Sequence, residues 1–262
     1  MHNFLRFARQ QISVQLQIRT FNLYSLLLFF IQPAIFSAVG MVLSRAAGNA
    51  APDLVYTVIG GGILGMWSGM VFTSTYDIRS DRRDGILELL IASPTSLRRI
   101  EAVRTFTNIT ASLVSLLVAV GAAVAIFHFS FNGINIFRLL LAVVILLYSL
   151  WCLGVFLANF LAWSRLSGSL VDFLELPMAF LCGFMYPITV LPQWLQGIST
   201  FVPVRWALQA LNATLLKNQE ISQYWFHIGM ALLTATIFWL TSLWFDRKVH
   251  DHIRLTGELS SI

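Results

Sequence analysis

The chain has 262 residues, of which 57% are hydrophobic and only 11% are charged, and its mean hydropathy is +0.75. So large an apolar share leaves too little polar surface to cover a water-soluble globule, which indicates an integral membrane protein. The formal net charge of +5 would suit nucleic acid, but no basic stripe interleaved with aromatic residues lies outside the apolar stretches, which argues against that partner.

Six apolar stretches can each cross a bilayer as a helix of about 20 residues. They are residues 21–43, 54–72, 106–127, 139–162, 170–186 and 224–245. The next apolar stretch, residues 188–216, is broken by Pro192, Gly197 and Pro203, so we expect an outer re-entrant hairpin there instead of a crossing. We therefore predict an all-α, polytopic membrane protein with one domain over residues 1–262.

The ends of the chain and the distribution of charge predict its orientation. In residues 1–20, apolar side chains at helical spacing gather on one side of a helix and basic and polar side chains on the other. This pattern favours an amphipathic helix lying at the inner interface. Most of the 17 Lys and Arg residues fall in that helix, in the connection at residues 77–100 and in the tail at residues 246–262. The positive-inside rule then places both termini and this connection in the cytoplasm.

Residues 81–94 form a charged segment between long apolar stretches. On a continuous helix, Asp81, Asp84, Gly85 and Glu88 fall at positions i, i+3, i+4 and i+7, so three carboxylates would share one face. Apolar residues take the opposite side, and Pro94 ends the run. We expect the acidic face to meet either water, as in any solvated interfacial helix, or a soluble partner.

This segment resembles the membrane-spanning permease subunits of type-2 ATP-binding-cassette (ABC) exporters. That family carries an acidic residue, three variable positions, Gly-Thr-Leu-Glu and an apolar stretch ending in Thr/Ser-Pro in this connection. The matching positions here are Asp81, Gly85, Leu87, Glu88, Ser93 and Pro94, with Ile86 in place of the threonine. A second match comprises residues 183–187 (Gly-Phe-Met-Tyr-Pro), residues 191–195, Pro203 and the Trp-Ala-Leu run at residues 206–208.

The resemblance implies that the segment is a coupling helix seated in a groove of a nucleotide-binding subunit. The coupling residues would be Asp81, Asp84, Gly85, Leu87, Glu88, Leu89, Ser93 and Pro94. It also implies a second permease copy or close homologue, two ATPase subunits that bind ATP and Mg, and a bacterial cell inner membrane location. Cargo would be a hydrophobic drug, as in multidrug efflux, an amphipathic natural product or a lipid-linked glycan, exported by alternating access.

The sequence has no Gly-x-x-x-x-Gly-Lys-Ser/Thr loop that could cradle nucleotide phosphates. We therefore expect no enzyme activity and no cofactor in this chain, with ATP hydrolysis confined to a partner. Neither a metal site nor a disulfide is expected, because Cys152 and Cys182 lie in apolar stretches and His250 and His252 do not share a helical face.

A stripe of small residues marks the second predicted span, where Gly61, Gly65 and Gly69 recur every four residues. Such a stripe lets another helix approach closely. Two readings stay open: ordinary packing within the chain, or the seam near the axis of a dimer.

The candidate substrate path rests on residues inside the first and fifth predicted spans: Gln32, Asp172, Glu175, Phe180, Phe184 and Met185. Asp172 and Glu175 lie one helical turn apart near the predicted cytoplasmic end, where buried charges need a partner or an aqueous cavity. They would face a cytoplasmic vestibule that favours cationic cargo, or Arg165 would simply neutralise them. In the hairpin, Trp194 and Trp206 are expected to anchor the chain at the outer interface.

Two other classes of protein compete with this interpretation. An ion-driven secondary transporter or channel calls for paired charges or broken helices near the membrane midplane, whereas Asp172 and Glu175 sit near one surface. A membrane-embedded enzyme calls for a cluster of His, Asp or Glu, or a serine–histidine arrangement, at the span ends, and none is recognisable in the sequence.

Overall fold

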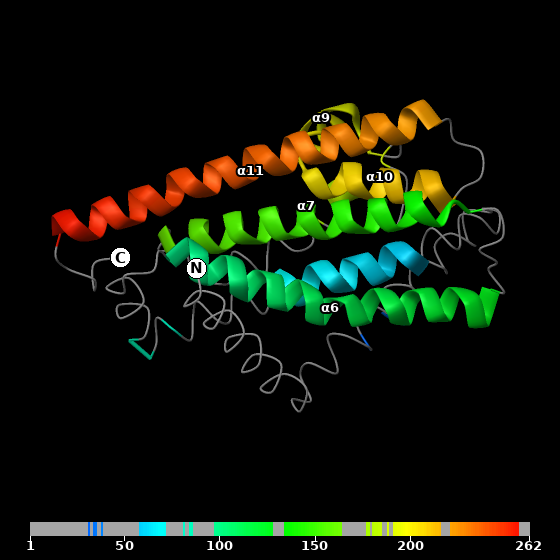
Figure 1. Ribbon diagram of the computed structural model, residues 1–262, viewed down its shortest axis with the longest axis horizontal. Coiled ribbons are helices and arrows are strands. Elements are labelled where there is room, and N and C mark those ends of the chain that lie inside the picture. The colour runs from blue at the N-terminus through cyan, green and yellow to red at the C-terminus, as the bar shows by residue number, and fades with distance from the viewer. Residues whose placement is uncertain are drawn as a thin grey trace.

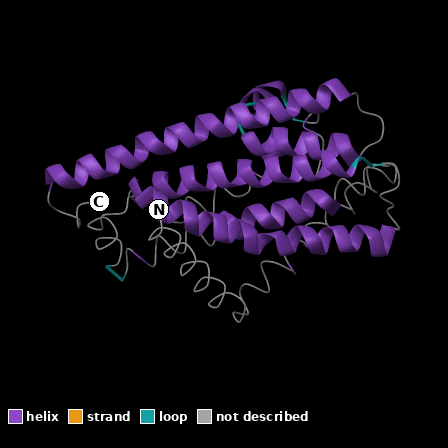
Figure 2. Cartoon of the chain, viewed as in Figure 1, coloured by secondary structure: helices purple, strands orange, loops and turns teal. Residues whose placement is uncertain are grey.

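The computed structural model describes residues 31, 34–35, 38, 58–71, 81, 84–85, 97–127, 134–163, 177–178, 180–184, 188, 191–215 and 221–256. Throughout these ranges the regular structure is helical (Figure 2), in agreement with the predicted all-α class. The elements are Val58–Val71, α6 (Leu97–Phe127), α7 (Ile136–Trp163), α9 (Gln193–Ser199), α10 (Pro203–Leu215) and α11 (Ile221–Thr256). The predicted amphipathic helix at residues 1–20 and most of the first and fifth predicted spans lie outside the described residues.

Within the described part of the chain, three helices are long and apolar enough to cross a membrane. Their candidate spans are Arg99–Gly121, Ile136–Phe160 and Ile221–Asp246, which agree in place with the predicted third, fourth and sixth spans. The described helix Val58–Val71 agrees in place with the second but is shorter. The helix bounds are wider than the hydropathy predicted, because α6 starts at Leu97 and α11 continues to Thr256, into the predicted tail.

Local sequence signals explain where two of these helices begin. Leu97 opens α6 three residues after Pro94, which could not lie inside a helix without removing a backbone hydrogen bond. Asn135 precedes α7, and its Oδ1 accepts a hydrogen bond from the Arg138 backbone N–H at 3.3 Å. This is the position and geometry of an N-cap, which satisfies one of the backbone donors left open at a helix start.

The helix Val58–Val71, α6 and α7 alternate in direction. Trp151, beyond the middle of α7, donates from Nε1 to the carbonyl of Ala102, near the start of α6, at 2.8 Å. Figure 1 shows that these two helices run in opposite directions. The helix Val58–Val71 is antiparallel to α6 as well, because Gly62 lies against Ala119 while Met70 lies near Thr105.

The last long helix runs parallel to α7. Near the start of both helices, the Tyr224 hydroxyl of α11 donates to the Arg138 carbonyl at 2.9 Å. Far along both, Asn159 Nδ2 donates to Ser242 Oγ at 2.8 Å. The chain therefore returns from one end of the bundle to the other between Trp163 and Ile221, as the predicted order of spans requires (Figure 1).

The two short helices α9 and α10 lie at the end of the bundle where α11 begins (Figure 1). Pro203 opens α10, which packs against α7 and α11, and Trp206 makes ring contacts with Phe226 and His227 of α11. The predicted break in residues 188–216 is thus present. At 13 residues, α10 is too short to cross a bilayer, which takes about 20.

The structure corrects the expectation for Trp206. Trp206 is only 8% exposed, and its Nε1 donates a hydrogen bond to the Thr200 carbonyl at 2.8 Å. Its indole therefore stabilises the connection between α9 and α10 from the buried side. The Arg205 guanidinium lies over its ring at 4.8 Å and donates to the Gln196 carbonyl at 2.9 Å. Trp194, at 67% exposed, remains available as an interface anchor.

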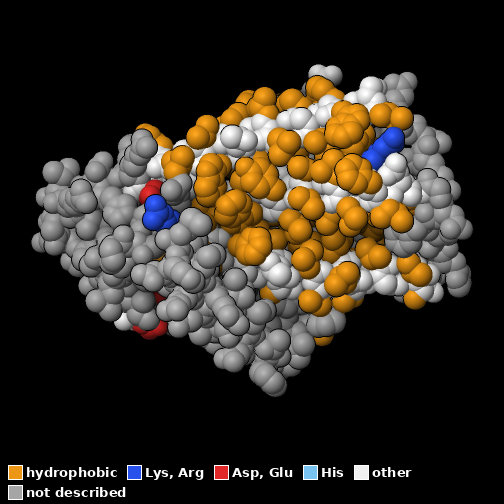
Figure 3. All heavy atoms as spheres, viewed as in Figure 1, with side chains coloured by type: hydrophobic (Ala, Val, Ile, Leu, Met, Phe, Trp, Pro, Cys, Tyr) orange, Lys and Arg blue, Asp and Glu red, His pale blue; other side chains and the backbone are white. Residues whose placement is uncertain are grey.

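The described outer surface of the helices is apolar. Large hydrophobic side chains that are more than a third exposed recur along α6, α7 and α11. Figure 3 shows them as a broad apolar face, with the visible charged side chains toward its two ends. An apolar surface of this extent would aggregate in water and is the surface that lipid covers. The protein is therefore membrane-embedded.

Candidate functional site

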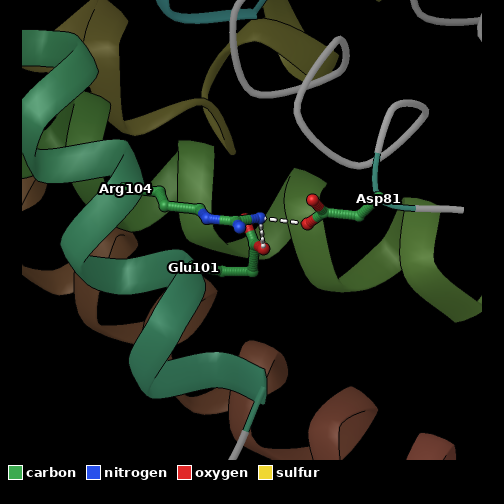
Figure 4. Close-up of polar contacts among 3 residues, drawn as sticks. All are labelled: Asp81, Glu101 and Arg104. Atoms are coloured by element: carbon green, nitrogen blue, oxygen red, sulfur yellow. Dashed lines mark hydrogen bonds and ion pairs between the residues drawn. The ribbon is translucent and has the colours of Figure 1, made fainter. Parts of the chain in front are cut away.

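Three charged side chains meet at the end of the bundle where α6 begins, opposite to α9 and α10. They are Asp81, Glu101 and Arg104, which we call the acid–arginine cluster (Figure 4). Glu101 and Arg104 project from neighbouring positions of α6, whereas Asp81 reaches them from a separate segment of the chain. Arg104 lies one helical turn after Glu101, so both side chains share one face of α6.

Arg104 binds both carboxylates through the same nitrogen atom. Its Nη1 donates to Asp81 Oδ2 and, at 3.2 Å, to Glu101 Oε1. The cluster is nearly closed to solvent, with Glu101 only 1% exposed and Asp81 and Arg104 below one tenth. In a site so poorly accessible to water, each charge needs a partner of opposite sign, because burying an unpaired ion costs several kcal/mol of free energy.

This geometry corrects the predicted acidic face. Asp81 is helical, but Asp84 and Gly85 form an exposed turn in which Gly85 has φ +68°. A left-handed residue interrupts a right-handed helix, so the continuous helix predicted through Gly85 is broken at that residue. Asp81 therefore points inward to Arg104 while Asp84 is exposed, so these two carboxylates do not share one outward face, and Glu88 lies outside the described residues. The other predicted coupling residues, Leu87, Glu88, Leu89, Ser93 and Pro94, lie outside the described residues.

The part of α6 that carries the cluster is tied to the rest of the bundle at Ala102. Ala102, between Glu101 and Arg104 in sequence, accepts the hydrogen bond from Trp151 of α7. The ring centroid of Trp151 in turn lies 4.9 Å from that of Trp239 in α11. Displacement of the start of α6 is therefore resisted by a direct contact with α7, which in turn packs against α11.

Sequence reasoning missed Glu101 and Arg104. The hydropathy placed the third span from residue 106, so Arg104 was assigned to a cytoplasmic connection, whereas it is a buried residue of α6. A signal was present in the sequence: an acid and an arginine stand at positions i and i+3 at the start of an apolar helix. Each of these charges can be buried in a membrane protein only when it is paired with the other.

Of the predicted substrate-path residues, Gln32, Asp172, Glu175 and Met185 lie outside the described residues. The two remaining phenylalanines face different surroundings. Phe180 is 54% exposed, whereas Phe184 is fully buried in the core. Gly183, with φ +67°, ends the short helical stretch between them.

The glycine stripe is buried within the single chain. Gly61, Gly65 and Gly69 belong to Val58–Val71, in which every residue is buried. This burial favours packing within the chain over an open seam for a second copy. Gly62, which the stripe did not include, packs tightly against α6: a Cβ there would collide with the Ala119 side chain.

The family model for the ABC-2 type transporter matches residues 4–216. That match includes the acid–arginine cluster, the turn at Asp84 and Gly85, and the helices up to α10. The protein belongs to the ABC-2 type transporter family and is a membrane permease subunit of a type-2 ABC transporter. Members of this family normally work with ATPase partners in the membrane. No curated protein matches the sequence.

Proposed function

We propose that this chain is the permease half of an ATP-driven exporter. It would pair with a second copy or a close homologue and bind two nucleotide-binding ATPase subunits. The cargo would be a hydrophobic or amphipathic molecule, such as a drug, a natural product or a lipid-linked glycan, taken from the cytoplasm or the inner leaflet. The bacterial cell inner membrane, with both termini in the cytoplasm, is the proposed location.

The observation that carries this proposal is the position of the turn at Asp84 and Gly85. The turn is exposed, and three residues before it Asp81 is bound by Arg104 of a helix long enough to cross the membrane. A partner that grips the exposed part of this segment would therefore pull on α6 directly. Such a linkage between an external grip and a membrane span is what an ATPase-driven permease needs.

The proposed mechanism is alternating access driven from outside the membrane. ATP binding would close the ATPase subunits and move residues 81–94 with them, which shifts the spans from an inward-open to an outward-open arrangement. For nucleotide to drive this change, the two arrangements must differ in their affinity for the nucleotide-bound ATPase.

The first test is whether an ATPase subunit co-purifies with the chain and whether its ATP hydrolysis depends on residues 81–94. We expect Glu88→Arg, in the predicted coupling helix, to weaken that association and to lower cargo-stimulated ATP hydrolysis. Glu220→Arg, the same charge reversal on the predicted outer side, is the matched control and should leave both unchanged. An ATPase that binds and couples equally well to the Glu88→Arg protein would refute the assigned role.

The second test addresses the competing class and the orientation. Transport in vesicles that needs an ion gradient but neither ATP nor a bound ATPase would identify an ion-driven transporter or channel. Single cysteines in place of Asp84 and Trp194, both exposed, should react with a membrane-impermeant reagent from opposite sides. Labelling of Asp84→Cys from outside the cell would overturn the proposed orientation.

A further inference from the structure

The acid–arginine cluster holds one cation between two carboxylates that belong to different parts of the chain. Glu101 is on the same helix as Arg104 and moves with it, whereas Asp81 belongs to the segment that ends in the exposed turn. Figure 4 shows the guanidinium between the two carboxylates, with Asp81 entering from the side opposite to α6. The two contacts to Arg104 therefore differ in what would happen to them during motion of residues 81–85.

Separating a buried ion pair is costly chiefly because it leaves an uncompensated charge behind. Here Arg104 would keep the Glu101 carboxylate at 3.2 Å if Asp81 withdrew, so the cation would stay paired. Asp81 in turn lies three residues from an exposed turn, which gives its carboxylate a short route to water. The arrangement lowers the cost of opening the Asp81 contact without removing the attraction that closes it.

We propose that Arg104 is a positioning residue that fastens the segment beginning at Asp81 to α6, and that Glu101 makes this fastening releasable. Arg104 then transmits displacement of the segment to the membrane span. Glu101 keeps the cation paired in the conformation where Asp81 is released. This inference deepens the proposed function and rests on it.

The two aspartates that helical spacing predicted on one face have different roles in this arrangement. Asp81 is directed inward and serves the connection to α6, while Asp84 is exposed and remains on the side open to a partner. Neutralising Asp81 should therefore leave the binding of the ATPase intact and break only the transmission of its movement.

The experiment measures cargo transported per ATP hydrolysed by the permease reconstituted in proteoliposomes with its ATPase. Asp81→Asn and Arg104→Met should each lower this ratio about tenfold, since each removes one partner of a nearly buried pair. The ATPase should still co-purify with both. Arg138→Met, a partly buried arginine near the start of α7, is the matched control and should keep the wild-type ratio.

Two variants separate a positioning role from a general loss of structure. Arg104→Lys keeps the positive charge but not the planar fork, so it should recover the ratio to within about threefold of wild type. The exchange Asp81→Arg with Arg104→Asp again places one cation between two carboxylates and should recover much of the loss. If the double variant Asp81→Arg with Arg104→Asp transports no more cargo per ATP than Arg104→Met, the pairing role is overturned.

Glu101→Gln tests whether Glu101 makes the contact between Asp81 and Arg104 releasable. With one carboxylate fewer, Arg104 should hold Asp81 more persistently, so transport and ATP hydrolysis should slow together at an unchanged ratio. A Glu101→Gln protein that cycles at the wild-type rate overturns this part. If wild type transports with its ATPase while Asp81→Asn and Arg104→Met keep the full ratio, the inference fails and the proposed function stands. If wild type binds no ATPase, the proposed function fails, and the inference fails with it.

Discussion

Gly62 offers the sharpest test of how the helices pack. A methyl group there would collide with the Ala119 side chain and would lie 3.2 Å from the Ser115 carbonyl oxygen and 3.4 Å from the Leu116 Cα. Two of these neighbours are backbone atoms of α6, so no side-chain rotation can relieve the overlap. We therefore expect Gly62→Ala to force Val58–Val71 and α6 apart.

The matched control is Gly121→Ala, because Gly121 lies in α6 and, beyond its own stretch of helix, no atom of the described residues lies within 4 Å of the site for a Cβ. Each substitution gains about 1 kcal/mol of helix propensity, and that gain cancels when the two proteins are compared. Their difference is then the cost of overpacking, about 1–3 kcal/mol. For a chain of this size, that cost corresponds to roughly 2–10 °C in apparent unfolding temperature.

The buried thiols supply the assay. Cys152 and Cys182 are free and buried, so a fluorogenic thiol reagent reports on them only as the detergent-solubilised protein unfolds. Midpoints are compared at one heating rate, since unfolding of membrane proteins is commonly irreversible. Adding Ala119→Gly to Gly62→Ala should recover part of the loss by removing the opposing methyl group. Equal midpoints for Gly62→Ala and Gly121→Ala, or strictly additive effects in the double variant, would refute the contact.

Three further substitutions test the contacts that hold the bundle together, each by the same thermal assay. Trp151→Phe loses the 2.8 Å hydrogen bond to the Ala102 carbonyl but keeps an aromatic ring, so it should cost about 1 kcal/mol. Asn159→Ala and Ser242→Ala each remove the buried 2.8 Å hydrogen bond between α7 and α11, and each should cost about 0.5–2 kcal/mol, with the double variant costing less than the sum. Gly183→Ala forces a left-handed alanine and should cost about 1–2 kcal/mol.

Controls for these substitutions come from the same chain. Gly197→Ala in α9 adds a methyl group where nothing lies within 4 Å, so it should not share the loss expected for Gly183→Ala. Trp194→Phe changes an exposed indole and should leave the midpoint unchanged, in contrast to Trp151→Phe. Fully additive losses in the Asn159→Ala and Ser242→Ala pair would count against a direct bond between them.

The sequence predicted the class of the fold and the order of its parts because those depend on long apolar runs and on prolines. The third, fourth and sixth spans, and the break ahead of α10, follow from hydropathy and from Pro203. The placement of the charged connection and the hairpin at opposite ends follows from the alternating direction of the helices. None of this requires knowledge of which side chains touch.

The site was harder to predict because it depends on pairing between distant residues. Helical spacing put Asp81 and Asp84 on one face, but the Asp84-Gly85 dipeptide is itself a turn signal that should have argued against a continuous helix. Arg104 was left in a connection because its charge lowers the local hydropathy, although the neighbouring carboxylates allow it to be buried. Gly62 was overlooked since spacing alone cannot tell which side of a wholly buried helix is nearest to its neighbour.

The length of α11 has a practical consequence for following this transporter at work. The helix runs ten residues past the end of its apolar span, from Asp246 to Thr256, a distance of about 15 Å at the usual helical rise. A fluorophore attached at Thr256 would therefore be carried by a continuous helix and not by a flexible linker. Its orientation would record any rotation or tilt of the final span, giving a direct optical signal of the conformational cycle.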